Sequence, residues 1–461
     1  MDLSPMWRLR AAFITHIPPS RNNFPPQQYQ IFRAFASTHV PQSTRNLDNV
    51  TCAPPQGWPG LNSWRASGVN ERRLWGDKGP QQVETSMYTL SFREKAFKSL
   101  AEYGRQVLLC PDPFKKAELS HQAWRHYNTG TLPIGTAEAP LAPSRPEKPE
   151  LLPARQIPTI KQTDLPLNVY TLHNLAHVEL NAIDLAWDSV VRFSSLHLPD
   201  SFYTDFARIA DDESRHLGWC LQRLEELGSY YGCMPAHSLL WDGCAVSAGD
   251  VQARLAIVPM SQEARGLDAG GRLADRLVGW GDNRSAKIVA QIAEEEKAHV
   301  GVGVAWFTAF CAAQGSDPGR VFAETLTELC PDLLWGGHFN HDARKEVGLL
   351  REWYDMESGK WPEELVQKAD MAKMKIKEQG KVEKEEKLKK ERQLKFTAGG
   401  GAIELGVVDD GVGLKKAVVG CGEYRSSCGA VVPGMKMEKL RGRLFFMLSI
   451  EAAAAADAVA P

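Results

Sequence analysis

Apolar residues recur at every third or fourth position through the middle of the chain, which is the spacing of one face of an α-helix. This periodicity predicts four long helices, at residues 169–193, 201–227, 250–278 and 282–315. Pro259 falls inside the third of them. Because proline lacks an N–H group and its ring clashes with the preceding turn, we expect a kink at this position.

The connections between these segments predict how the helices pack. Short connections join the first helix to the second and the third to the fourth, so each pair should be antiparallel. Residues 228–249 form one long crossover between the two pairs. Two helical hairpins joined by one long crossover have the ferritin-like connectivity. We therefore expect an all-α protein whose main body is a ferritin-like four-helix bundle with one long crossover.

Changes in composition divide the rest of the chain. A segment rich in Pro, Asn, Gln and Gly is expected to be irregular, and a run of prolines after the first short helices reads as a linker. The expected parts are an irregular extension (1–85), a short helical region (86–130), the proline-rich linker (131–166), the bundle with a C-terminal packing segment (167–357), and a charged, low-complexity tail (358–461). The short helical region should hold two helices, near 92–107 and 113–127.

A glutamate lies in the middle of the apolar face of each long helix, and on two of the helices a histidine follows three residues later. Four buried carboxylates are prohibitive unless cations compensate them. Single glutamates on two helices, with Glu-x-x-His on two others, form the ligand set of di-iron and di-manganese helical proteins. We expect two iron ions, or manganese as the alternative. The predicted ligands are Glu179, Glu213, His216, Glu263, Glu296 and His299.

An internal repeat supports this assignment. Residues 210–218 match residues 293–301 in kind, and the segment that begins at Glu179 resembles the segment that begins at Glu263. The first pair of glutamates is 34 residues apart and the second pair is 33 residues apart. Two copies of one helical hairpin, each contributing half of a metal site, explain both agreements.

Other acidic residues lie near the predicted ligands. Asp212 and Glu295 fall one step off the apolar faces and are expected to face solvent or to support the ligands. Asp184 and Asp268 lie round the helix from the lone glutamates. They are expected either to hydrogen-bond ligand histidines or to form ordinary ion pairs, for instance with Arg215 or Arg265.

Two histidines and the cysteines are not expected to bind metal. His173 and His177 precede Glu179 on its helix, and a fifth and sixth position would have to bend towards the metals. The nine cysteines include no Cys-x-x-Cys pair, which argues against a zinc ribbon or an attached rubredoxin-type centre. Their odd number and irregular spacing predict a reduced, intracellular protein.

Charge and hydropathy give little support for a nucleic-acid or membrane partner. The chain has 54 basic and 56 acidic residues, which gives no general basis for nucleic-acid binding, and no apolar run approaches the length of a membrane span. Residues 373–395 hold ten Lys or Arg and five Glu, so the tail should be a solvated helix or disordered, with nucleic-acid contact as the minor alternative. Residues 3–47 contain five arginines and no acidic residue. This composition fits a mitochondrial or plastid transit peptide or a disordered extension of a cytoplasmic protein.

Six segments resemble a ferritin-like family catalogued as domain of unknown function 455. They are residues 177–187, 212–216, 231–241, 263–268, 296–299 and 339–344. The resemblance spans about residues 86–355. It implies a ferritin-like fold and a di-metal site at the six positions given above. The wider superfamily includes oxygen-activating hydroxylases, one of which acts on a modified adenosine of transfer RNA, and this link is an analogy of fold alone.

Three functions follow from these expectations. The first is an oxygen-activating, hydroxylase-like di-iron oxidoreductase, because four carboxylates and two imidazoles leave coordination positions open for dioxygen. It requires an electron donor, which the chain does not provide. The second is iron handling by a ferroxidase, and the third is a non-catalytic scaffold. The substrate and the oligomeric state are not predicted.

Overall fold

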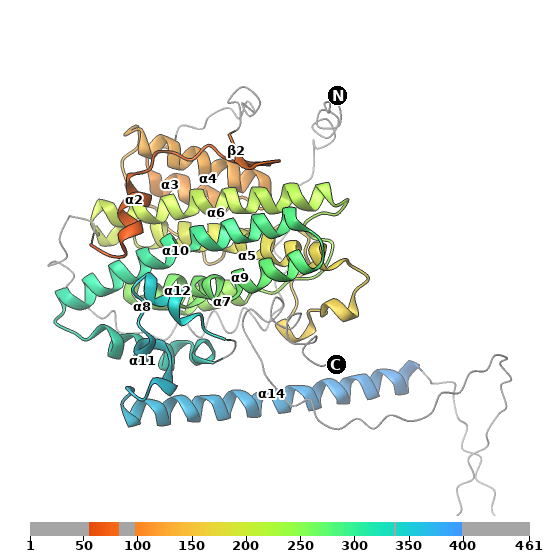
Figure 1. Ribbon diagram of the computed structural model, residues 1–461. Coiled ribbons are helices and arrows are strands. Elements are labelled where there is room, and N and C mark those ends of the chain that lie inside the picture. The colour runs from red at the N-terminus through yellow and green to blue at the C-terminus, as the bar shows by residue number, and fades with distance from the viewer. Residues whose placement is uncertain (1–54, 83–96, 336–337, 399–461) are drawn as a thin grey trace, which may run out of the picture.

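The computed structural model describes residues 55–82, 97–335 and 338–398 and is mostly helical (Figure 1). The four predicted long helices are present, with bounds close to the expected ones. They are α5 (Leu167–Arg192), α6 (Asp200–Glu226), α8 (Val251–Ile257) continued by α9 (Ala264–Gly279), and α10 (Asn283–Ala313). Asp250 and Asp282 accept hydrogen bonds from backbone N–H groups in the first turns of α8 and α10, which fixes where these two helices begin.

The long helices pack as two pairs. α5 lies along α6, and α9 lies along α10, while α10 also contacts α6. The crossover between the pairs contains α7 (Leu239–Val246), which contacts α5. Almost every residue of α5 is buried, because other elements cover it on several sides. A space between the two pairs is therefore shielded from solvent, and the candidate site lies there.

The third long helix is interrupted where the sequence predicted a kink. Residues Val258–Glu263 form a π-helical segment between α8 and α9, and Pro259 lies within it. The missing N–H of Pro259 removes a regular helical hydrogen bond, which accounts for the local change in winding. A Cβ atom on Gly303 would lie 2.6 Å from the Pro259 ring. Glycine at this position of α10 is thus required for the close approach of the two helices.

A layer of two helices covers α5 and α6. α3 (Leu100–Leu108) packs on α5, and α4 (Pro113–Asn128) packs on α6. The helix predicted near 92–107 is therefore present from Leu100, and residues 83–96 lie outside the described part. Residues 131–166 run over these helices in mainly extended form, with short 3-10 turns at Ala154–Gln156 and Ile160–Gln162.

Part of the segment 1–85 is regular, in contrast to the expectation that it is irregular. Pro59–Ala66 form helix α2, and Leu74–Gly76 pairs with Gly79–Gln81 as the antiparallel hairpin β1–β2. Pro59 at the first helical position and Gly79 with φ of +114° are the local signals that suit a helix start and a tight turn. The hydrophobic pattern does not reveal these elements, because their few apolar residues pack on α6 and α10 rather than on one another.

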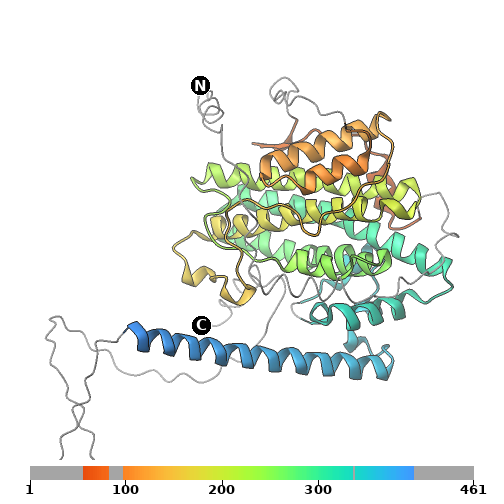
Figure 2. The same cartoon turned by 180° about the vertical axis from the view of Figure 1, so that it is seen from behind.

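The C-terminal part begins with short helices that pack on α8, α9 and α10 and ends in one long helix (Figures 1 and 2). These elements are α11 (Pro318–Leu329), α12 (His341–Glu346), α13 (Arg351–Tyr354) and α14 (Glu363–Ala398), with 3-10 turns at Pro331–Leu334 and Met356–Ser358. Another 3-10 turn, at Ser194–Leu196, follows α5. The sequence left two alternatives for the tail, a solvated helix or disorder. Helix α14 agrees with the first alternative as far as residue 398. No helix among the described residues has both the length and the apolar character needed to cross a membrane.

Candidate metal centre

The six predicted ligands converge between the two pairs of long helices. Glu179 comes from α5, Glu213 and His216 from α6, Glu263 from the end of the π-helical segment, and Glu296 and His299 from α10. Glu213 and both histidines are fully buried, Glu179 and Glu296 nearly so, and Glu263 is partly buried. Residues far apart in the sequence thus meet because each lies at the middle of its helix.

The first group of ligand atoms surrounds His216. One atom each from Glu179, Glu213, His216 and Glu296 lies within 4.8 Å of the other three. The Nδ1 atom of His216 is 3.4 Å from an oxygen of Glu179, 3.4 Å from an oxygen of Glu213 and 3.8 Å from an oxygen of Glu296. Three carboxylates and an imidazole therefore face one small volume.

The second group surrounds His299. Atoms of Glu263, Glu296 and His299 lie within 4.8 Å of one another. The Nδ1 atom of His299 is 2.8 Å from Glu213 Oε1 and 3.4 Å from Glu296 Oε2. Glu213 and Glu296 thus belong to the surroundings of both histidines. The two imidazole rings lie 5.9 Å apart, with these two carboxylates close to both.

Burial and neighbouring charges shift the pKa values of the side chains in the cluster. Burial, with the nearby charge of Glu213, raises the pKa of Glu179 well above its usual range and also raises the pKa of Glu296. Burial likewise raises the pKa of Glu263. Burial opposes the charged form of both histidines, but the carboxylates around them outweigh it and raise the pKa of His216 and of His299. Without cations, the cluster therefore holds protons in place of part of its charge.

Unsatisfied atoms show that the cluster suits a cation. Glu263 Oε2 is buried and makes no hydrogen bond. Glu179 Oε2, Glu213 Oε1 and His299 Nδ1 are also buried and make no well-directed hydrogen bond, although each lies within 3.4 Å of an oppositely charged group of the cluster. Buried polar atoms without partners are rare in folded proteins and need an explanation. Carboxylate oxygens and imidazole nitrogens are ligands that suit iron and manganese. The buried cluster of glutamates and histidines could therefore hold metal ions.

The Nε2 atom of each histidine contacts an acidic residue on the other of the two helices α6 and α10. His216 Nε2 lies 2.9 Å from Glu295 Oε2, and His299 Nε2 lies 3.4 Å from Asp212 Oδ2. Arg215 contacts both of these carboxylates. Burial opposes ionisation of Glu295, but contact with His216 lowers its pKa to about 2. Of the two roles expected for Asp212 and Glu295, the structure shows the supporting one.

Asp184 and Asp268 do not reach the histidines. Asp184 is buried between Lys116 and Arg145, and Asp268 accepts two hydrogen bonds from Arg344, at 2.8 and 2.6 Å. The alternative of ordinary ion pairs is thus observed. Asp268 also lies 3.6 Å from Arg265, an ion-pair partner expected from the sequence. The main partners were missed because they lie far away in the sequence.

His173 and His177 bind the crossover loop. His177 Nδ1 is 2.7 Å from the hydroxyl of Tyr231, and its Nε2 is 2.7 Å from the carbonyl oxygen of His237. His173 Nε2 accepts the backbone N–H of Gly232 at 2.9 Å. Burial lowers the pKa of His173 to about 4 and that of His177 to about 3. These histidines have hydrogen-bonding partners away from the cluster.

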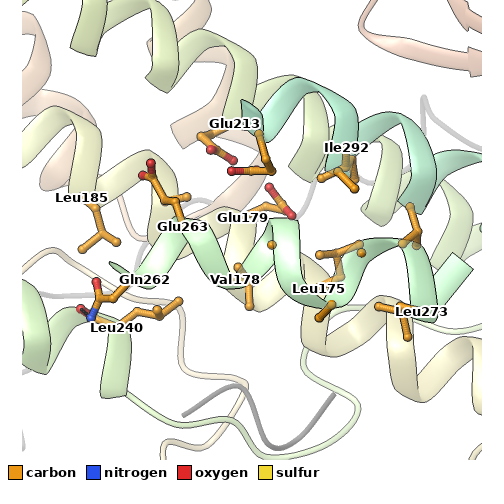
Figure 3. A pocket seen from close by; sticks show the side chains of 17 residues that line it. Leu175, Val178, Glu179, Leu185, Glu213, Leu240, Gln262, Glu263, Leu273 and Ile292 are labelled. Atoms are coloured by element: carbon orange, nitrogen blue, oxygen red, sulfur yellow. Dashed lines mark hydrogen bonds between the residues drawn. The ribbon is translucent and has the colours of Figure 1, made fainter. Parts of the chain in front are cut away.

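A small cavity opens on the cluster (Figure 3). Its volume is about 60 Å³, and its walls are mainly apolar side chains of α5, α9 and α10, with Leu240 of α7. Glu179, Glu213 and Glu263 border it, as the sticks in Figure 3 show. Gly266 also lines it, and a Cβ atom there would lie 3.3 Å from Glu296. The cavity gives the carboxylates an apolar neighbouring space.

Two tryptophans of the N-terminal segment were missed by sequence reasoning. The Nε1 group of Trp64 on α2 donates a hydrogen bond to Asp212 Oδ2 at 2.7 Å. Trp75 on β1 packs edge-on against Trp219, whose ring lies 5.5 Å from that of His216. No local pattern predicts these contacts. The only sequence signal is the presence of tryptophans in a segment otherwise poor in large apolar residues.

The fold and the cluster together define a helical protein with a buried Glu/His site that could hold metal ions. The family model described as "Protein of unknown function (DUF455)" matches residues 109–355, and the chain belongs to this family. An uncharacterized protein of Haemophilus influenzae is 33% identical over 215 residues, which cover 46% of this chain and 74% of that protein. No solved structure matches the chain. The family resemblance seen in the sequence is confirmed.

Proposed function

We propose that this protein is a ferritin-like di-iron oxidoreductase. The observation that carries the proposal is the pair of overlapping groups of buried carboxylates and imidazoles, in which Glu263 Oε2 has no hydrogen-bonding partner. Glu179 and His216 would hold one ion, Glu263 and His299 would hold the other, and Glu213 and Glu296 are shared. Two divalent cations would balance the four carboxylates.

The arrangement of the helices supports the ferritin-like part of the proposal. α5 and α6 form one hairpin, α9 and α10 form the other, and the long crossover through α7 joins them. Each hairpin supplies one lone glutamate and one Glu-x-x-His pair. This is the ligand distribution of ferritin-like carboxylate proteins.

The protein's own groups prepare the histidines for a metal. When Nε2–H of His216 donates to Glu295, the Nδ1 lone pair faces the carboxylate cluster, and Asp212 fixes His299 in the same way. Hydrogen bonds of this kind fix the tautomer and orientation of metal-binding imidazoles. A bound iron pair would supply the capacity to reduce dioxygen and oxidise a substrate. The wall of the cavity beside Glu179 and Glu263 is mainly apolar, which would favour an apolar molecule such as dioxygen over water.

The size of the cavity limits what can reach the cluster. Its volume of about 60 Å³ is well below the roughly 150 Å³ of an apolar cavity that admits benzene. It therefore has room for a molecule as small as dioxygen. An organic substrate would have to displace side chains such as Leu273 or Val178. The same small volume supports the alternative of a ferroxidase, which needs no organic substrate.

The test is metal analysis combined with visible absorption spectroscopy of the protein produced with iron. About two iron ions per chain, with an absorption band that bleaches on anaerobic reduction and returns with dioxygen, would support a redox-active di-iron centre. Oxygen consumption per iron, measured together with assembly size, would separate an oxygenase from a ferroxidase. A stable helical protein that binds no iron or manganese would overturn the proposal.

A further inference from the structure

We propose that Trp64 lies on the path by which an external electron donor would reduce a metal ion held at His299. The proposal rests on the di-iron function above and adds a route by which the centre is reduced. Trp64 lies on α2, and residues 55–82 precede the part of the chain that matches the family model, residues 109–355. The relay is therefore contributed by a segment outside the family domain.

A continuous chain of close contacts links Trp64 to His299. The indole Nε1–H donates to Asp212 Oδ2 at 2.7 Å, and the same oxygen lies 3.4 Å from His299 Nε2. The indole and imidazole rings are 6.4 Å apart and meet edge to face, at 69°. His299 Nδ1, on the opposite side of its ring, faces Glu213 and Glu296. Asp212 and the imidazole thus connect the indole directly to the candidate metal position.

The position of Trp64 is fixed by its surroundings. Arg65 forms a two-point ion pair with the buried Asp205, at 2.6 and 3.0 Å. The guanidinium group of Arg208 lies 4.6 Å from the indole centroid and donates to the backbone oxygen of Arg65. These contacts anchor α2 on α6. Trp64 remains partly exposed, so one end of the path reaches the surface while the other reaches a ligand.

A second aromatic path is less favourable for electron transfer. Trp75 contacts Trp219 at 5.2 Å between ring centroids, and Trp219 lies 5.5 Å from His216. The indole of Trp219 donates to the backbone oxygen of Arg72 rather than to a group that contacts a ligand. Trp75 is also buried, with 5% of its surface exposed. This path therefore reaches His216 through ring contacts without a hydrogen-bonded link, and it begins at a buried side chain.

The transfer is balanced as a one-electron step. A one-electron donor, such as a reduced redox protein or a viologen radical, would lose one electron, and a ferric ion held at His299 would gain it. No bond to Trp64 is formed or broken. The Nε1 proton stays on the indole in its hydrogen bond to Asp212, so the relay itself is unchanged after each transfer.

The test measures how fast the iron-loaded protein is reduced by the methyl viologen radical, followed by absorbance in a stopped-flow instrument. Trp64→Phe should slow reduction by about tenfold or more, which corresponds to about 1.4 kcal/mol in the activation barrier. Trp64→Tyr, which keeps an aromatic ring and a hydrogen-bond donor, should recover part of the rate. Iron content and thermal stability, measured for every variant, report whether the site and the fold are retained.

Trp58→Phe is the matched control, because Trp58 lies just before α2 and packs near Gly301 rather than against a supporting carboxylate. It should be reduced at the wild-type rate. A wild-type rate in iron-loaded Trp64→Phe, or slow reduction in Trp75→Phe alone, would overturn the relay while leaving the di-iron proposal intact. Failure of the wild-type protein to bind iron would instead overturn the proposed function itself.

Discussion

At the scale of single residues, Arg215 shows how the surroundings of the cluster are organised. Its guanidinium group is buried and contacts both Asp212 and Glu295, the two carboxylates that face the outer nitrogens of the histidines. A positive charge shared by two carboxylates keeps both ionised in a buried place. Ionised carboxylates accept hydrogen bonds from imidazole N–H groups more strongly than neutral ones do. One arginine therefore supports both histidines.

Replacing a shared ligand should remove metal from both positions. Glu213→Gln keeps the size of the side chain but loses the charge that both ligand groups use, so bound iron should fall from about two ions per chain to one or none. Metal analysis after gel filtration measures this, and circular dichroism checks the fold. Glu225→Gln is the control, since Glu225 is exposed on the same helix. Unchanged iron content in Glu213→Gln would show that the ligand assignment is wrong.

His173 should make the fold sensitive to acid. Its pKa is about 4 in the folded protein because burial disfavours the charged form, whereas an unfolded histidine has a pKa of about 6.5. The folded state therefore binds fewer protons, and stability is lost as the pH falls from about 6.5 towards 4, by roughly 3 kcal/mol in total. His173→Gln should remove much of this loss in urea unfolding curves measured across that range.

The control for this measurement is His197→Asn. His197 is exposed and has φ of 51°, a conformation that asparagine tolerates. The His197→Asn protein should lose as much stability as the wild type when the pH falls from about 6.5 towards 4. An equally steep loss of stability in His173→Gln would show that His173 is not responsible for the acid sensitivity.

At the scale of elements, the sequence predicted the regular helices well and the added segment poorly. α5, α6 and α10 were found because each carries a long, periodic apolar face, and the residues of the buried Glu/His cluster were found because the two hairpins repeat one pattern. The hairpin β1–β2 and α2 were missed because their stability comes from distant helices. Likewise, Lys116 pairs with Asp184 and Arg344 with Asp268 across 68 and 76 residues of sequence. Local patterns contain no information about such contacts.

The start of α14 should be needed for stability, unlike its later turns. Trp361, Leu365 and Ala369 are buried where the chain returns to α11. A chain ending at residue 375 should keep wild-type stability, whereas one ending at residue 360 should lose roughly 3 kcal/mol, because it exposes the apolar surface that these side chains cover. Urea unfolding of the two truncated proteins makes the comparison. Equal stabilities would show that the contact with α11 contributes little.

At the scale of the whole molecule, the cluster joins elements that otherwise pack as two pairs. Its side chains come from α5 and α6 on one side and from the π-helical segment and α10 on the other. Binding of a metal to the folded state alone stabilises that state by mass action. A metal at this position would therefore strengthen the contact between the pairs, where the unpaired carboxylates otherwise weaken it.

Removing metal should thus loosen the whole core. At metal concentrations about a hundredfold above the dissociation constant, the stabilisation should be about 2.7 kcal/mol, so chelation should lower the melting temperature by several degrees. Hydrogen exchange should become faster in α5 and α10 together. Faster exchange in α10 alone would contradict a site shared by the two pairs. The Glu213→Gln protein should show no response to the chelator.

The contact between Trp64 and Asp212 joins residues that are 148 positions apart. Since a chain leaves the ribosome from its N-terminus, Trp64 emerges long before its partner exists, and α2 also needs α10, which is made later still. Helix α2 therefore has to wait, unpaired, while most of the core is synthesised. Glu296 and His299 lie on α10 as well, so the cluster and the surface that holds α2 are completed together, late in synthesis.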